Sequence, residues 1–217
     1  MQSSNSNLKA LHKQQKRVAA ILPKNEIANL SDAEIWLAFK HGNETAFIYI
    51  YQSYFHSLLN YGVNFIDDRE VVKDCIQDLF IEIREKRSTI LVTDSIKPFL
   101  YKILRRKLGH FLRKHLDNTE LTPAHDKFRF ELSHEQHLIE RNFSEWQIKK
   151  LKEAILQLSV KEREIIFLFY FEDHSYQHIA EIMGYREVKT ARTLLYRAIA
   201  SLKSKLGPGF YSFILAL

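Results

Sequence analysis

The chain has 217 residues, enough for one or two domains with a sizeable core, and its formal net charge of +6 permits a polyanionic partner. Its six glycines and four prolines are few for a turn-rich β architecture and favour long helices. The single Cys75 excludes an internal disulfide, no apolar run reaches the roughly 20 residues of a membrane span, and the N-terminus lacks a secretory signal, so we expect a cytoplasmic protein.

The predicted N-terminal tail, residues 1–29, is basic, because its first 24 residues include lysines and an arginine but no acid. Helices follow it. Ser31 with Glu34 is a capping box for a helix that ends near Lys40, and Asn43 can cap a second helix from Glu44 to about Tyr61. The aromatic residues of this second helix are predicted to lie mostly in the core: Phe47, Tyr49, Tyr51, Tyr54 and Phe55.

The third predicted helix begins at Asp67-Asp68, ends near Lys86 and has two contrasting faces. One face is an apolar stripe for the core, and the other combines carboxylates with an isoleucine. That combination fits a docking surface for a basic partner with an apolar centre. A negatively charged surface with one stray apolar residue is the alternative. The proposed docking residues are Asp74, Gln77, Asp78, Ile81 and Glu85.

The fourth predicted helix runs from Ile96 to about His115, with Pro98 in its first turn, where a missing N–H is tolerated. It contains seven lysines and arginines and no acidic residue. Such like charges repel one another unless something neutralises them, and DNA phosphates are the obvious partner. Interleaved aromatic rings can also stack on unpaired bases. The predicted DNA-binding residues are Lys97, Tyr101, Lys102, Arg105, Arg106, Arg113 and Lys114.

The segment 116–143 is acidic and weakly periodic, and we interpret it as a linker between domains 30–115 and 144–206. The second domain is predicted to contain a helix to about Leu156, a capping box at Ser159 and Glu162, and an apolar run that is too apolar for a surface helix. Residues 207–217 form an apolar C-terminal tail.

The stretch from Ser175 to Lys205 reads as two helices joined through Gly184, the second one long and basic. Apolar residues of the second helix recur at the spacing of one buried stripe, which leaves a polar and cationic face opposite. This pattern favours a DNA-binding helix-turn-helix, although a core segment with a solvated charged face would look similar. The predicted base- and backbone-contacting residues are Lys189, Arg192, Thr193, Tyr196 and Arg197.

Taken in order, these motifs resemble the small bacterial sigma factors of the extracytoplasmic-function (ECF) type, within the sigma-70 family, and more narrowly those of Bacteroidetes. The run Asp74 to Ile83 is similar to the helix by which these proteins bind the clamp helices of the RNA polymerase largest subunit. The run Ile96 to Arg106 resembles the helix that melts and reads the −10 promoter element. Three further runs resemble parts of the −35-reading domain: Leu158 to Ile166, Ser175 to Gly184 and Thr190 to Ala198.

The resemblance implies an all-α fold in which a four-helix, region 2-like domain and a region 4-like helix-turn-helix domain are joined by a linker. It implies a sigma factor that binds core polymerase and promoter DNA, with a loop from Arg87 to Ser95 that captures an extruded base, and with an anti-sigma factor as a further partner. A stand-alone helix-turn-helix regulator with a sensor or dimerisation domain is the alternative. We predict no enzyme activity, catalytic residue, cofactor, metal or small-molecule substrate, because His174 and His178 lack further ligands and no phosphate-binding loop is present.

The sequence departs from the family pattern at several positions. Arg84 stands where tryptophan is frequent, so the end of the third helix is expected to pack differently, and Arg106 stands where asparagine is frequent. His178 replaces a common glutamate, which removes a capping-box partner for Ser175. The turn between the last two helices is one residue longer than usual.

Overall fold

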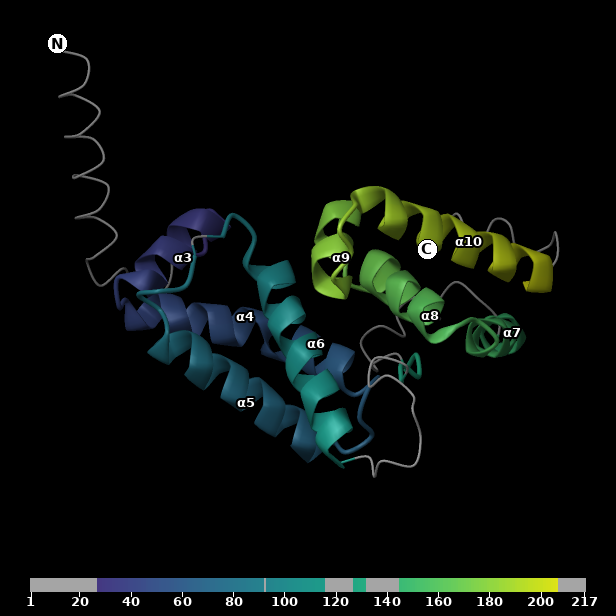
Figure 1. The fold of residues 1–217 in the computed structure, drawn as a ribbon, viewed down its shortest axis with the longest axis horizontal. Coiled ribbons are helices and arrows are strands. Elements are labelled where there is room, and N and C mark those ends of the chain that lie inside the picture. The colour runs from purple at the N-terminus through teal and green to yellow at the C-terminus, as the bar shows by residue number, and fades with distance from the viewer. Residues whose placement is uncertain (1–26, 92, 116–126, 132–144, 207–217) are drawn as a thin grey trace, which may run out of the picture.

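A computed structural model describes residues 27–91, 93–115, 127–131 and 145–206, and every regular element in these ranges is a helix (Figure 1). The predicted all-α class is therefore confirmed. The N-terminal domain contains α3 (Asp32–Lys40), α4 (Glu44–Gly62), α5 (Arg69–Glu85) and α6 (Ile96–His115). The C-terminal domain contains α7 (Glu145–Leu156), α8 (Val160–Ile166), the π-helical turn η2 (Phe167–Phe171), α9 (Tyr176–Met183) and α10 (Val188–Leu206).

Polar side chains fix the starts of the helices where the sequence predicts them. The Glu34 carboxylate accepts the Ser31 N–H at 2.9 Å while the Ser31 hydroxyl accepts the Glu34 N–H, and Ser159 with Glu162 forms the same pair of bonds ahead of α8. The Asn43 side chain accepts the Ala46 N–H at 3.0 Å. Each capping bond satisfies a backbone donor that the first turn leaves without a helical partner.

The core of the N-terminal domain lies between α4, α5 and α6, and its largest fully buried side chains include Trp36, Ile50 and Ile76. The predicted apolar stripe of α5 is buried, as the helical spacing requires. The five aromatic residues that we expected mostly in the core are instead half-buried and pack against it from α4. The inward positions of α4 are taken by Ala46, Ile50, Leu58, Leu59 and Tyr61.

The C-terminal domain is organised around α10, which packs on α7, α8 and α9. Gly184 joins α9 to α10 with φ +74, a left-handed conformation that glycine adopts without the steric penalty of a Cβ atom. The first four residues of the predicted apolar run, 165–168, are buried, and the last three, 169–171, are half-buried. None of the helices in the described ranges has both the length and the apolar character that crossing a bilayer requires.

The two domains pack against each other, with α9 beside α6 (Figure 1). The described part of the predicted linker, residues 127–131, contributes to this packing. Phe128 is 1% exposed and its ring lies 5.2 Å from Phe65 of the first domain and 5.5 Å from Phe167 of the second. This short segment of the predicted linker therefore packs between the two domains. Its apolar Phe128 and Phe130 make that packing possible, although the surrounding segment is acidic in composition.

Candidate nucleic-acid and protein interfaces

The predicted recognition face of α10 is open to solvent. Its opposite stripe, which includes Ala191, Leu195 and Ala198, is buried against the rest of the C-terminal domain. Because the helix repeats every 3.6 residues, burying that stripe turns the polar face outward. All the residues predicted to contact DNA through this helix are exposed: Lys189, Arg192, Thr193, Tyr196 and Arg197.

Two contacts orient the cations of this face. The Arg192 guanidinium lies over the ring of Tyr176 from α9, 5.3 Å from its centroid, and the Arg197 Nε lies 3.6 Å from a carboxylate oxygen of Glu162. Tyr176 is thus a neighbour of the recognition face that the spacing argument did not find. Its position at the start of α9 was the available signal, since the two helices of a helix-turn-helix pack closely there.

The departures from the family pattern have visible consequences. Arg84 donates to Glu44 at 3.0 Å and lies over the Phe47 ring, so the end of α5 is tied to the start of α4. The Ser175 hydroxyl still accepts the His178 N–H, at 3.2 Å. The imidazole at position 178 offers no carboxylate for the reciprocal bond, so α9 starts with a simple cap.

The predicted DNA-binding residues of α6 fall into two groups. Four are exposed: Lys102, Arg106, Arg113 and Lys114. The other three face the C-terminal domain, where Tyr101 is 0% and Arg105 is 8% exposed and Lys97 is half-buried. Successive residues are rotated by about 100° on a helix, so a helix that is basic on most sides directs some cations at whatever packs beside it.

Two buried glutamates of the C-terminal domain receive these three side chains. Arg105 donates to Glu164 through Nε at 2.7 Å and through a terminal nitrogen at 3.0 Å. The Tyr101 hydroxyl donates to Glu172 at 2.5 Å, and the Lys97 ammonium lies 3.0 Å from the same carboxylate. Sequence reasoning missed Glu164 and Glu172, because they lie in the other predicted domain and no local spacing connects them with α6.

Burial and charge set the protonation of this cluster. Burial first, and the Glu172 carboxylate second, raise the pKa of Tyr101 well above its usual value, so its hydroxyl keeps its proton and donates. Burial is the largest single influence on Arg105 and lowers its pKa, but the charge and hydrogen bonds of Glu164, with smaller contributions from Tyr61 and Tyr185, together outweigh it and the pKa is raised. Burial lowers the pKa of His174 to about 3, with Lys97 adding to the effect, so this imidazole is neutral.

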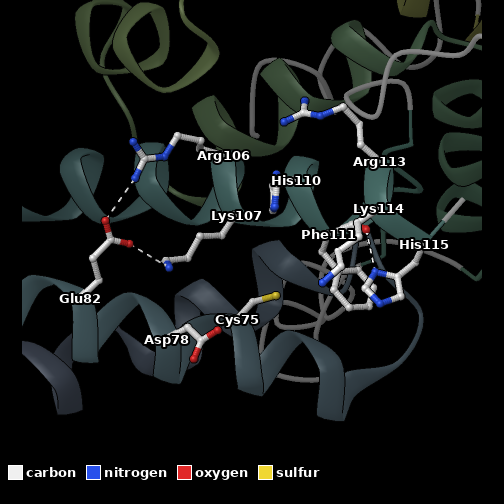
Figure 2. A pocket seen from close by; sticks show the side chains of 10 residues that line it. All are labelled: Cys75, Asp78, Glu82, Arg106, Lys107, His110, Phe111, Arg113, Lys114 and His115. Carbon is white, nitrogen blue, oxygen red and sulfur yellow. Dashed lines mark hydrogen bonds and ion pairs between the residues drawn. The ribbon is translucent and has the colours of Figure 1, made fainter.

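A cavity of about 520 Å³ lies between α5 and the second half of α6 (Figure 2). Near one end, Glu82 binds Lys107 at 2.8 Å and Lys86 at 2.9 Å, and hydrogen bonds from these two lysines lower the pKa of Glu82 to about 2. Arg113 and Lys114 line the other end and, among the described residues, form no ion pair (Figure 2). The groove therefore presents cationic groups that carry no ion pair within the described ranges, on the same helix as the paired Lys97 and Arg105.

Two side chains of α3 hold the loop that precedes α6 by donating hydrogen bonds to its backbone carbonyls. The Trp36 indole donates to the Leu91 carbonyl at 3.0 Å, and the Lys40 ammonium donates to the Ile90 carbonyl. A cavity of about 490 Å³ adjoins this loop, and it is lined by apolar side chains, including Ile90, Phe99 and Ile182, and by lysines and arginines. The cavity is lined by both domains, since α9 contributes to it.

The acidic face of α5 is exposed as predicted. Ile81 is 55% exposed, although the neighbouring stripe of the same helix is buried. The whole predicted set lies on the solvent side of the helix: Asp74, Gln77, Asp78, Ile81 and Glu85. Within the described ranges, no group of three His, Cys, Asp or Glu residues has the geometry of a metal site, and His174 and His178 lie 6.1 Å apart, ring to ring.

Comparisons with known proteins agree with this arrangement. Residues 148–202 match the family "Sigma-70, region 4". RNA polymerase sigma factor YlaC of Bacillus subtilis is 24% identical over 159 residues, 72% of this chain and 90% of its own length. RNA polymerase sigma factor SigV of the same organism is 28% identical over 155 residues, 71% of this chain and 85% of its own length.

Among solved structures, CnrH in complex with the cytosolic domain of CnrY is similar to this chain, with a TM-score of 0.55 and 19% identity. The match covers 81% of this chain and 96% of CnrH. At this identity it supports the fold. Since both sequence relatives come from Bacillus subtilis, the narrower resemblance to sigma factors of Bacteroidetes stays a prediction.

Proposed function

The chain belongs to the RNA polymerase sigma factors of the sigma-70 family, in the ECF group, and from this premise we propose how its surfaces divide the work of initiation. Its function is to direct transcription initiation. We assign core polymerase to the acidic face of α5, the −10 element to α6 and the −35 element to α10. The observation that carries this assignment is the exposed polar face of α10, which lies within the matched region 148–202.

The face of α10 has the side chains needed to read a major groove. Arginine and lysine favour guanine edges, and a threonine methyl favours thymine. Lys189, Arg192 and Thr193 lie near the start of the helix, where recognition helices contact bases, and Arg197 lies further along, nearer to the DNA backbone.

On the first domain, the exposed cations of α6 would neutralise phosphates around the −10 element. The apolar side chains of Ile90, within the loop from Arg87 to Ser95, and of Phe99, just after it, belong to the first domain alone and support the expected role of this loop in holding an unstacked base. Unstacking a base costs a few kcal/mol, which stacking and phosphate contacts offset.

The exposed Ile81, with carboxylates around it, supports docking on a basic surface with an apolar centre, as a hot spot ringed by charge does. An anti-sigma factor is a further partner implied by the family resemblance, and CnrH is itself seen bound to the cytosolic domain of CnrY. Sigma factors act on polymerase in the cytoplasm, and we place this chain there.

Reconstituted transcription tests the assignment. Core polymerase with the purified chain should produce run-off transcripts from specific sites on genomic fragments, whereas a stand-alone regulator would bind duplex DNA without directing core enzyme. Arg192→Ala should weaken use of the −35 element by about 1–3 kcal/mol and leave core binding intact. Lys149→Ala, which removes an exposed cation from α7, is the control.

Core binding has its own matched pair. Ile81→Ala should weaken association with core polymerase, whereas Ile48→Ala, which truncates a similarly exposed isoleucine on α4, should not. If both variants bound core polymerase like the parent protein, the assignment of α5 would be wrong.

A further inference from the structure

The interface between the domains contains a polar cluster that the transcription role of α6 does not explain. Glu164 is 0% exposed, and its two oxygens accept the fork of Arg105. The Tyr61 hydroxyl donates to the same carboxylate at 2.6 Å, so both domains contribute to this buried group. An arginine fork binds carboxylate and phosphate in the same two-bond geometry. Glu164 therefore occupies the guanidinium in the way that a DNA phosphate would.

Glu172 of the C-terminal domain makes a similar set of contacts with the side chains that lie one and two turns before Arg105 on α6. It is 3% exposed and receives Tyr101, while Lys97 reaches both its carboxylate and its backbone carbonyl, the latter at 2.5 Å. Lys97, Tyr101 and Arg105 are four residues apart in sequence, so they lie along one face of the helix. The C-terminal domain packs on this face, where Tyr101 and Arg105 are buried and Lys97 is half-buried.

The same interface also contains a poorly satisfied polar group. His174 is 2% exposed, its ring packs edge-on against Tyr101 at 4.7 Å, and its Nε2 has no hydrogen-bond partner within the described part of the chain. A buried polar atom without a partner raises the free energy of the packed state. Separation of the domains would return this nitrogen to water, which is what a reversible contact requires.

We propose that Glu164 and Glu172 form an autoinhibitory latch, in which carboxylates of the C-terminal domain occupy Lys97, Tyr101 and Arg105 of α6 in place of DNA. The inference rests on the proposed role of α6 in binding the −10 element. In the free chain the docked state masks this face, and DNA binds it only from the fraction of molecules whose domains are apart. The apparent affinity of the α6 face is reduced by that fraction.

Removing the latch charges tests the proposal in the free protein. The double variant Glu164→Gln and Glu172→Gln should bind a random-sequence single-stranded DNA oligonucleotide about tenfold more tightly or better, by fluorescence anisotropy. The plot of log affinity against log salt should steepen by about 1.4, because Lys97 and Arg105 each become available to a phosphate. The variant Glu70→Gln and Glu153→Gln removes two exposed carboxylates and controls for the change in net charge.

Equal affinity and equal salt slope for the latch variant and its charge-matched control would overturn the proposal. A chain in which both latch glutamates are intact gives a second test, which does not depend on how the glutamine variants fold. Spin labels at Gln52→Cys and Lys149→Cys, both exposed positions in different domains, report the interdomain distance by double electron–electron resonance. This chain also carries Cys75→Ala, because Cys75 lines the groove of Figure 2. The distance should increase when core polymerase binds.

An unchanged distance in a holoenzyme that starts transcription would show that the docked state is the active one, and the latch would be wrong while the sigma function stands. If instead no holoenzyme forms, the proposed function fails, and the oligonucleotide measurement on the free chain still decides whether the carboxylates mask α6.

Discussion

The helices α6 and α10 are alike in sequence and differ in what surrounds them. Each is long, amphipathic, basic and free of acidic residues. The recognition face of α10 points away from its own domain, and its cations are exposed. The cations of α6 are spread around the helix. Some of them are exposed, whereas Lys97 and Arg105 are paired with Glu172 and Glu164.

This difference shows that the charge content of a helix identifies what it can bind, whereas the packing of the rest of the chain decides when it can bind. Cations that project from a single face stay available. Cations that encircle a helix invite carboxylates from the same chain, and each such pair competes with phosphate.

The largest predicted effect comes from removing the ion pair between Arg105 and Glu164, which distinguishes α6 from α10. Arg105→Ala would leave Glu164 buried without its charged partner, which costs about 3–5 kcal/mol in the docked state. The domains should therefore separate, and the radius of gyration from small-angle scattering should increase. Arg192→Ala, the same substitution on α10, should leave the scattering curve unchanged, so identical curves for both variants would contradict this view of the interface.

The pairing of α6 with its own domain should depend on pH. The folded pKa of Glu82 is lowered to about 2, below its value of about 4.3 in an unfolded chain, so its ion pairs contribute fully above that unfolded value. The contribution is lost as the pH falls from about 5 towards 2. Glu82→Gln should lower the free energy of unfolding by roughly 1–2 kcal/mol at neutral pH, with partial exposure screening the pair.

Urea titrations at a series of pH values check this prediction. The difference between the parent protein and Glu82→Gln should shrink towards zero in acid. A difference that persists at low pH would mean that lost packing, rather than the lysine pairs, explains the effect.

A smaller effect is predicted for the cap of α9, the helix that packs on both α6 and α10. Ser175→Ala removes the acceptor for the His178 N–H and should cost about 1 kcal/mol of stability in thermal or urea unfolding. Thr190→Ala, at an exposed position near the start of α10, should change stability by less than about 0.5 kcal/mol. Equal losses would mean that the Ser175 cap adds nothing specific.

The smallest effect sharpens the distinction within α6. In the free chain, Lys102→Ala should reduce the salt slope of single-stranded DNA binding by about 0.7, because Lys102 is exposed. Arg105→Ala should not reduce it, because Glu164 already engages the guanidinium and the predicted separation of the domains frees Lys97 for a phosphate. A larger loss of slope for Arg105→Ala than for Lys102→Ala would show that Arg105 is accessible in solution.

Local patterns in the sequence predicted most of the fold. The capping boxes at Ser31 and Ser159, the glycine between α9 and α10, and the exposed face of α10 all depend on residues within a few positions of one another. Short-range periodicity and hydrogen bonding determine such features, so they can be read without knowing the tertiary structure.

The interdomain cluster could not be predicted in this way. Arg105 and Glu164 are 59 positions apart, and Tyr101 and Glu172 are 71 apart, so their pairing depends on how two domains dock. Glu164 belongs to a short charged stretch that looks like a solvated helix start. The docking of the two domains places this carboxylate in the interior, against Tyr61 and Arg105.

The most direct test of the account is to map both helices on one promoter. Lys102→Cys on α6 and Thr193→Cys on α10 are exposed positions to which a DNA-cleaving iron chelate can be tethered. In a holoenzyme that directs initiation, the two positions should cut near the −10 and −35 elements, about two helical turns apart. Cuts from both positions at a single site, or no cuts from α6 in an active holoenzyme, would contradict the account.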